Sequence, residues 1–385
     1  MTQCSRIIQC TITLILFAAN LNGESKKSSQ NEIDLSKIGY PARCDYLFQD
    51  SDHYAKRHIE FVDDEHLLVT FPLRSVPCDK YGQPPAEKYR SVIIDLTGKA
   101  LSSFERLPGE NIQAGPDKRL LMSSGWQIRL LDWNFATLQH IDWTSSQGPQ
   151  SKLPRWTGRL ILAPSRTGFL VTDGYPPNHT SYFEGMPAGQ TSGVASCSLP
   201  AVTDGGFGCL EVNTEELHIH VGDSVREIRD PILFQARAAI LPDSQTILIL
   251  NEKYKLFLLG GPGGSREIAD LRWLTPGASS GFRWEMASAA SQRIMFFGHG
   301  ARVPITDSSG FGYYLRTAIV DVTSKRIVFR KQYPIDDDLA VSPNGQFLAV
   351  RNKSNLTLIS LPEAEHSMHR DGSKVNSLPP PAASP

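Results

Sequence analysis

Six segments of this chain repeat one pattern, in which an apolar strand, a tight turn and a second apolar strand follow one another. In 339–350, LAVSPNGQFLAV, Leu339 and Val341 alternate with other residues, and the SPNG that starts at Ser342 suits a type I turn. A hairpin of this kind is only marginally stable alone in water. Similar segments lie at 112–122, 160–171 and 238–250, and looser ones at 59–69 and 284–297.

The turns of these six segments recur at a regular interval. They lie at Asp63, Pro116, Pro164, Pro242, Ser288 and Pro343. The spacings between successive turns fall between 46 and 55 residues, except for one of 78. A strand-rich repeat of this length is typical of the blades of a β-propeller.

A second hairpin follows the first in most repeats. These hairpins are expected at 91–101, 128–141, 255–268 and 317–328. Two hairpins make a four-stranded sheet with apolar residues on both faces, which is not stable when both faces meet water. Radial stacking of such sheets covers the two faces. The sequence therefore predicts an all-β fold, a β-propeller of four-stranded blades.

The number of blades depends on the long interval between Pro164 and Pro242. It holds either one blade with a Gly-, Pro- and Ser-rich insertion at 174–208, or a separate degenerate blade that includes 207–228. These readings give six and seven blades, and the length of the chain slightly favours seven. The last repeat lacks an outermost strand, and we expect an N-terminal strand, offered by residues 43–49, to close the ring.

The segment AVSPNGQFLAV at 340–350 resembles the YVTN/WD40-like β-propeller repeat superfamily, of the exported bacterial type, through its strand–SPxG–strand core. The resemblance covers residues 55–361. It implies a propeller whose innermost strands line a central channel, with ligands at the mouth where those strands begin. It implies no particular activity, because propellers serve both as binding modules and as enzymes.

The N-terminus has the pattern of a secretory signal peptide. A positive residue, Arg6, precedes the mostly apolar residues 7–19, and a polar stretch begins at Glu24. The apolar run is too short to span a bilayer. We therefore expect cleavage near Gly23, no membrane span in the cleaved chain, and a secreted or periplasmic protein.

The remaining boundaries follow from composition. Residues 1–23 form the signal peptide, 24–40 a flexible segment, 41–362 the propeller, and 363–385 a disordered, Pro-rich tail. The chain has 385 residues, 40% of them hydrophobic, and a formal net charge of −1. It has neither a basic stripe nor an RNA-binding aromatic motif, which argues against a nucleic-acid partner.

Four cysteines lie beyond the signal peptide: Cys44, Cys78, Cys197 and Cys209. An even number in an oxidising compartment predicts two disulfides. Of the three possible pairings we favour Cys44–Cys78 with Cys197–Cys209, because each of these closes a shorter loop. No CxxC spacing is present, so a zinc or thioredoxin-like site is not expected.

One polar position recurs five residues before each turn. It holds His58, Asn111, Arg159, Arg237, Arg283 and Asp338. The residues four and two places before each turn are apolar or small, so the period of a strand separates a packed set from a polar set. With the placement that the resemblance implies, these residues form a polar ring at the channel mouth. Its three arginines suit an anionic or carboxylate group, and the alternative is a mouth that is polar only because it is wet.

Other residues give weaker signals. His299 lies in GHGAR, 298–302, which we expect to be a loop that opens on the same face, and we include it among the ligand-binding candidates. His218 and His220 share one face of a strand but lack a clear third ligand, and no metal site is predicted. The sequence contains neither a nucleophile elbow nor a convincing phosphate-binding loop.

These observations favour an exported binding or scaffold module over an enzyme, with a protein, peptide, glycan or small anion at the channel mouth. The alternative is a propeller-type enzyme, such as a quinoprotein-like dehydrogenase or a metal-dependent lactonase. Fragments of a lactonase-like metal site are offered by Glu60, Asn111, Glu285 and Asp338, but three neighbouring arginines would repel the cation. The sequence identifies no catalytic residue and no cofactor.

Overall fold

The structure is a computed structural model that describes residues 30–41, 59–73, 87–124, 127–142, 159–172, 179–185, 187–194, 196–243, 245–260, 264–274, 282–286, 292–304, 311–334 and 337–362. For residues 30, 282–286, 299–304 and 311–314 only the backbone is described. The predicted signal peptide, His58, Cys44, Cys78 and the predicted tail lie outside these ranges.

Seven four-stranded sheets make up the fold, and the strands of each sheet pair antiparallel with their neighbours. Blade 1 contains β2 (Ile59–Phe61), β3 (His66–Leu73), β4 (Lys88–Asp95) and β5 (Ala100–Arg106); blade 2 contains β6 (Asn111–Ala114), β7 (Leu120–Ser124), β8 (Gln127–Leu131) and β9 (Thr137–Asp142); and blade 3 contains β10 (Arg159–Leu162), β11 (Gly168–Thr172), β12 (Thr180–Glu184) and β13 (Gly189–Val194). Blade 4 contains β14 (Leu199–Thr203), β15 (Gly206–Leu210), β16 (Glu216–Val221) and β17 (Ser224–Arg229), and blade 5 contains β18 (Ala236–Ile240), β19 (Ile247–Asn251), β20 (Lys255–Leu259) and β21 (Arg266–Asp270). Blade 6 contains β22 (Phe282–Met286), β23 (Arg293–Pro304), β24 (Phe311–Asp321) and β25 (Arg326–Pro334), and blade 7 contains β26 (Asp338–Val341), β27 (Phe347–Asn352), β28 (Asn355–Ser360) and β1 (Gln30–Asp34).

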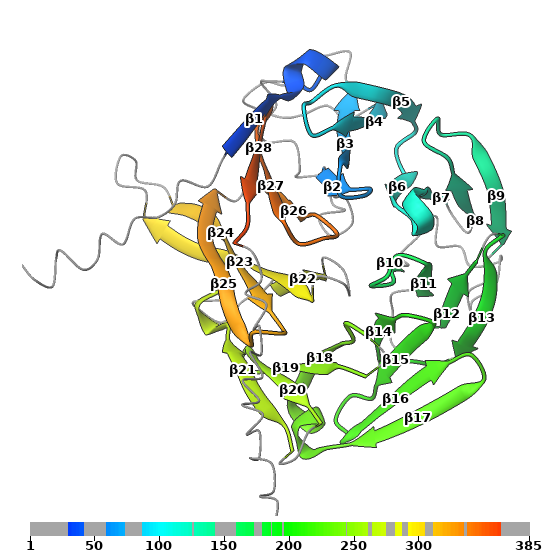
Figure 1. The fold of residues 1–385 in the computed structure, drawn as a ribbon, viewed down its shortest axis with the longest axis vertical. Helices are drawn as coiled ribbons and strands as arrows, with labels where there is room; N and C mark the ends of the chain where they lie inside the picture. Colours follow the sequence, from blue (N-terminus) through cyan, green and yellow to red (C-terminus); the bar gives the residue numbers. More distant parts are fainter. Residues whose placement is uncertain are drawn as a thin grey trace, which may run out of the picture.

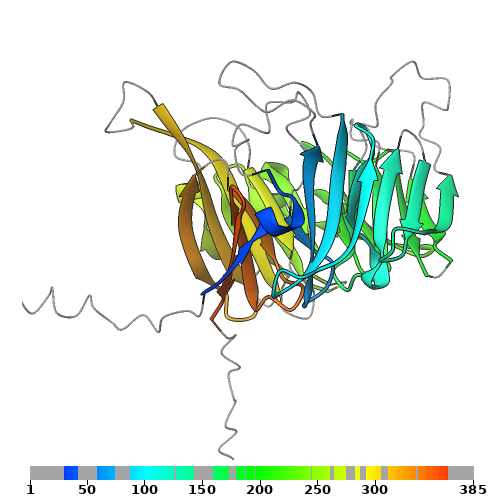
Figure 2. The ribbon, with the colours of Figure 1, turned by 90° about the horizontal axis from the view of Figure 1, so that it is seen from above.

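The sheets radiate around a central axis, with the first strand of each blade innermost (Figure 1). Seen from the side, the strands run from one face of the ring to the other (Figure 2). The helical turns are the short 3-10 segments η1 (Leu35–Ile38), η2 (Pro116–Lys118), η3 (Pro231–Gln235) and η4 (Arg272–Leu274). Across the described ranges, no helix is long and apolar enough to cross a membrane. The prediction of an all-β propeller is confirmed.

The long interval between Pro164 and Pro242 contains a complete fourth blade, so the propeller has seven blades. Strands β15, β16 and β17 occupy the segment 207–228 that sequence suggested for a degenerate blade. The insertion reading is wrong, because the segment 174–208 supplies β12, β13 and β14. Its polar residues fit this role, since β13 is the outermost strand of its blade and most of its side chains are exposed.

An N-terminal strand closes the ring, as predicted, but it is β1. This strand pairs with β28 from Gln30↔Ile359 to Asp34↔Asn355. It lies within 24–40, the segment expected to precede the propeller, while 43–49 lies outside the described residues. Ile33 and Leu35 are buried in the core between the last and first blades, which gives β1 an apolar contact that pairing alone would not.

The hydrophobic cores lie mainly between neighbouring blades. The cluster between the fifth and sixth blades joins Ile240 and Leu250 to Ile294 and Phe296. Corresponding clusters lie between the other neighbours. Each sheet therefore covers the apolar face of the next, as the repeat pattern predicted.

The two faces of the ring differ in the length of their connections. On one, which we call the short-turn face, hairpins close through turns such as 62–65, 204–205 and 342–346. In the last of these, Gly345 N donates to Ser342 O at 2.8 Å, the hydrogen bond expected of the SPNG turn. On the other, the long-connection face, the strand ends are joined by segments such as 39–58, 74–87 and 143–158. The innermost strands begin at the long-connection face.

Candidate functional site

The predicted ring positions lie where the innermost strands begin, on the long-connection face. Asn111, Arg159 and Asp338 are the first residues of β6, β10 and β26. Arg237 and Arg283 are the second residues of β18 and β22. His58 lies outside the described residues. In the fourth blade, which the turn alignment omitted, the equivalent position is Leu199, which packs against the core shared with the fifth blade.

Arg159 and Arg237 are both exposed and present uncompensated charge. Within the described part of the chain, neither forms an ion pair with a carboxylate. A register shift between Ala236 and Ala238 displaces Arg237 from regular pairing. Its guanidinium carbon lies 4.7 Å from the centroid of the Tyr254 ring, and its Nη1 donates to the Tyr254 hydroxyl at 2.7 Å. These contacts hold Arg237 in place without neutralising its charge.

Asp338 has a structural task that sequence did not reveal. Its Oδ2 accepts a hydrogen bond from Ile59 N at 3.1 Å, which ties the seventh blade to the first. The carboxylate of Glu60 does the same between the first and second blades, because Oε2 accepts from Ala114 N at 2.9 Å. Between the second and third blades, Gln113 Nε2 donates to Leu160 O at 3.2 Å. Polar side chains of the inner strands therefore join neighbouring blades.

Asn111 is half-buried and pairs with Ser123 across β6 and β7. For Arg283 only the backbone is described, and it pairs with Phe297. His299 was expected in a loop but lies within β23, paired with Leu315 and next to a register shift. The loop expectation for 298–302 is wrong because the hairpin of β23 and β24 continues past the end of β22, as far as Pro304↔Phe311.

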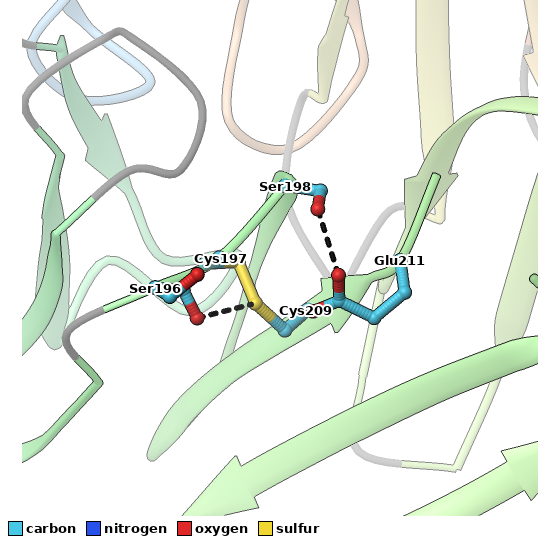
Figure 3. Close-up of a disulfide and its surroundings, with 5 residues drawn as sticks. All are labelled: Ser196, Cys197, Ser198, Cys209 and Glu211. Carbon is cyan, nitrogen blue, oxygen red and sulfur yellow. Dashed lines mark hydrogen bonds between the residues drawn. A yellow bond between two sulfur atoms is a disulfide. The ribbon is translucent and has the colours of Figure 1, made fainter. Parts of the chain in front are cut away.

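A disulfide fixes the entry to the fourth blade on this face. Cys197, just before β14, is bonded to Cys209 of β15, and their Cα atoms lie 5.4 Å apart (Figure 3). Beside it, the Ser198 hydroxyl donates to Glu211 Oε2 at 2.7 Å. This disulfide was predicted, and it holds the chain segment that leads directly to Leu199. The predicted Cys44–Cys78 pair lies outside the described residues.

Arg166 braces the opposite end of the channel. It belongs to the turn between β10 and β11, on the short-turn face, and has φ of 60°. Its Nη1 donates to Phe61 O at 2.9 Å and to Val62 O at 2.8 Å, both in the first blade. This contact reaches past the second blade. Sequence reasoning missed it, since an arginine in a polar turn resembles any solvated residue.

The structure describes only some of the side chains proposed for a metal-dependent enzyme. Among the described residues, no group of three His, Cys, Asp or Glu side chains is placed to hold a metal ion. Glu60 and Asp338 accept backbone hydrogen bonds, as above, and the side chain of Glu285 is not described. His218 Nε2 lies 3.5 Å from Glu216 Oε2. The other carboxylate oxygen of Glu216, Oε1, lies 2.9 Å from Arg229 Nη2.

The fold resembles solved structures, whereas the sequence lacks recognisable relatives. No protein-family model and no curated protein matches this chain. Similar structures include a fungal alcohol oxidase of the AA5 family in complex with copper, with TM-score 0.47, 9% identity, and coverage of 79% of this chain and 73% of that chain. Another is a chain of the mitotic checkpoint complex, with TM-score 0.45, 10% identity, and coverage of 89% and 98%. At these identities the similarity concerns fold alone.

Proposed function

We propose that this protein is an exported binding module of the YVTN/WD40-like type that holds an anionic ligand at the channel mouth on the long-connection face. The observation that carries the proposal is that Arg159 and Arg237, at the start of two innermost strands, are exposed and form no ion pair with a carboxylate among the described residues. A guanidinium group presents a planar set of donors that matches a carboxylate, phosphate or sulfate group.

The contrast between ring residues supports this assignment. Asp338 uses its carboxylate for the contact between blades, while Arg237 is positioned by an aromatic ring and keeps its charge. Leu199 interrupts the ring between Arg159 and Arg237, so the two guanidinium groups approach a ligand from separate blades. A ligand with two or more anionic groups therefore suits the mouth better than a single small ion.

The Cys197–Cys209 disulfide supports export, because stable disulfides form and persist mainly in oxidising compartments. The predicted signal peptide at 1–23 agrees with this assignment.

Calorimetric titration with citrate tests the proposal. We expect citrate to bind the wild-type protein and to bind Arg159→Gln/Arg237→Gln about tenfold or more weakly, because hydrogen bonds to charged groups contribute about 1.5–3 kcal/mol each. The matched control is Lys99→Gln/Lys325→Gln, which removes the same charge from exposed turns on the short-turn face. Absence of binding to the wild type, or an equal loss in the control, would reject the proposal.

A further inference from the structure

Two arginines converge on one tryptophan at the outer part of the boundary between the fifth and sixth blades. Trp273 belongs to η4, which connects these blades. The guanidinium carbons of Arg316 in β24 and Arg330 in β25 lie 5.6 and 5.0 Å from the centroid of the Trp273 ring. Arg316 is fixed further, since Nη1 donates to Trp273 O at 2.7 Å and Nε to Gln332 Oε1 at 3.1 Å.

Arg316 and Arg330 bring two positive charges to one aromatic ring. Among residues that the structure describes, no carboxylate lies within ion-pair distance of Arg316 or Arg330. Two acids of the fifth blade are already paired, Asp270 with Arg272 and Glu267 with Lys255. Hydrogen bonds from Arg272 lower the pKa of Asp270 to about 2. Like charges held together this way favour an anion between them.

The cations continue inward to the channel mouth. Arg237 lies over Tyr254, and Tyr254 O accepts a hydrogen bond from Leu271 N at 2.9 Å, two residues before Trp273. Tyr254 and Trp273 pack on the same core between the fifth and sixth blades. We call this surface the blade 5–6 seam and define it by Arg237, Tyr254, Trp273, Arg316 and Arg330. In this surface, Arg237 lies over the Tyr254 ring, and Arg316 and Arg330 lie over the Trp273 ring.

An exposed aromatic residue lies three positions before Arg237 in the chain. Phe234 belongs to η3, which packs on the core between the fourth and fifth blades, and it is 54% exposed although its neighbour Leu233 is buried. A segment that reaches Arg237 could extend to this side chain, and a large exposed apolar side chain suits a polypeptide better than a purely polar anion, because it offers contact to an apolar residue.

We propose that the blade 5–6 seam binds an extended acidic segment of a partner polypeptide. Carboxylates of the segment contact Arg237 at the mouth and the Arg316–Arg330 pair at the outer end, and an apolar residue of the segment packs on Phe234. Arg330, stacked on the Trp273 ring, keeps its donor edge available for a carboxylate, while Arg316, whose Nη1 and Nε already donate, contributes Nη2 and its charge. The proposal rests on the proposed function in assigning the ligand to the long-connection face, and it adds the partner class and the path.

Fluorescence anisotropy tests it with a labelled synthetic peptide of alternating Glu and Gly residues around one central Phe. We expect Arg316→Gln/Arg330→Gln to weaken peptide binding about tenfold or more and to leave citrate binding unchanged. Arg316→Lys/Arg330→Lys should restore part of the affinity, because lysine keeps the charge but not the planar donor set. Lys99→Gln/Lys325→Gln is the charge-matched control, and near-ultraviolet circular dichroism confirms the fold of each variant.

Three results would overturn the seam proposal: equal peptide affinity in wild type and Arg316→Gln/Arg330→Gln, an equal loss in the control, or binding of a Gln-for-Glu peptide as tight as that of the acidic one. A sulfated oligosaccharide that binds the seam more tightly than the peptide, with the same dependence on Arg316 and Arg330, would also overturn it. The two proposals fail separately, since citrate reports on Arg159 and Arg237 whereas the seam variant changes only the peptide.

Discussion

At the scale of single residues, exposed and buried arginines of this protein differ in their contacts. Arg293 is only 3% exposed and Asp321 is 1% exposed. Arg293 Nε lies 3.5 Å from Asp321 Oδ2. Its Nη1 donates to Gly345 O at 2.6 Å, and its Nη2 donates to Pro362 O. It therefore ties the sixth blade to the turn of the seventh and to the chain that leaves β28. Arg159 has no such partner within the described ranges.

Arg293→Met should destabilise the protein strongly. The substitution leaves Asp321 buried without its cation, and breaking a buried pair in this way costs about 3–5 kcal/mol. We expect a lower midpoint of urea unfolding, while Lys325→Gln at an exposed turn should stay within about 0.5 kcal/mol of wild type. Equal midpoints for the two variants would contradict the role given to Arg293.

His220 should make stability depend on pH. Its ring stacks on Phe207 with centroids 4.9 Å apart, and burial, with a smaller contribution from His218, lowers the pKa of His220. The unfolded chain therefore takes up this proton at a higher pH than the folded chain, so stability falls as pH drops through the ordinary histidine pKa of about 6.5. When the pH is lowered from about 7.5 to about 5.5, the melting temperature of His220→Gln should fall less than that of wild type. An identical loss in both proteins would refute this.

At the scale of elements, packing as well as pairing holds the strand that closes the ring. Ile33 of β1 and Leu35 of η1 are buried in the core with Ile59 and Leu356. A Cβ on Gly98, in the turn between β4 and β5, would lie 2.4 Å from Ile33 Cγ2. This turn of the first blade therefore fits closely around β1. Sequence reasoning placed the closing strand at 43–49 because that segment directly precedes the first repeat.

Leu35→Ala tests the contribution of this contact. The side chain is fully buried, and removal of a buried leucine costs about 2–5 kcal/mol. Leu107→Ala is the matched control, because Leu107 is 61% exposed. We expect denaturant unfolding to show a clear loss for the first variant and almost none for the second. Similar losses of unfolding free energy for the two variants would mean that β1 and η1 do not stabilise the ring.

The Cys197–Cys209 disulfide should stabilise the fourth blade. It joins residues 12 apart in sequence, and a crosslink of that length contributes about 3 kcal/mol through the entropy of the unfolded chain. We expect Cys197→Ser/Cys209→Ser to melt at a lower temperature than wild type and to lose less melting temperature on reduction, because only the predicted Cys44–Cys78 bond is left to reduce. A wild-type melting temperature unchanged by full reduction would disprove this contribution.

At the scale of the whole molecule, side-chain contacts that cross the short-turn face brace the ring. Arg166 crosses the short-turn end, and Asn344 N donates to Asp64 Oδ1 at 2.7 Å between the seventh and first blades. The exposed Arg159 and Arg237, η3 and η4 all lie on the long-connection face. We propose ligand binding at the long-connection face, while contacts that hold the blades together occur at both faces.

Sequence predicted this architecture more fully than it predicted the site. Period-two alternation before a turn fixes which face a side chain takes, so the positions of Arg159 and Arg237 followed from alignment. The fourth blade stayed ambiguous because its turn, 204–205, lacks the proline of the other clear repeats. The bond from Ile59 N to Asp338 joins residues 279 apart, and no local pattern carries such information. The Arg–Trp–Arg group is equally non-local.

We propose that ligands bind at the long-connection face. Hydrogen exchange of the full chain, measured with and without the acidic probe peptide, tests this proposal. We predict slower exchange at η3, at the starts of β10 and β18, and around η4, because bound ligand restricts local opening. The turns 62–65, 163–167 and 342–346 should exchange at the same rate in both samples. Protection confined to those short turns, with η3 and β18 unchanged, would contradict the account.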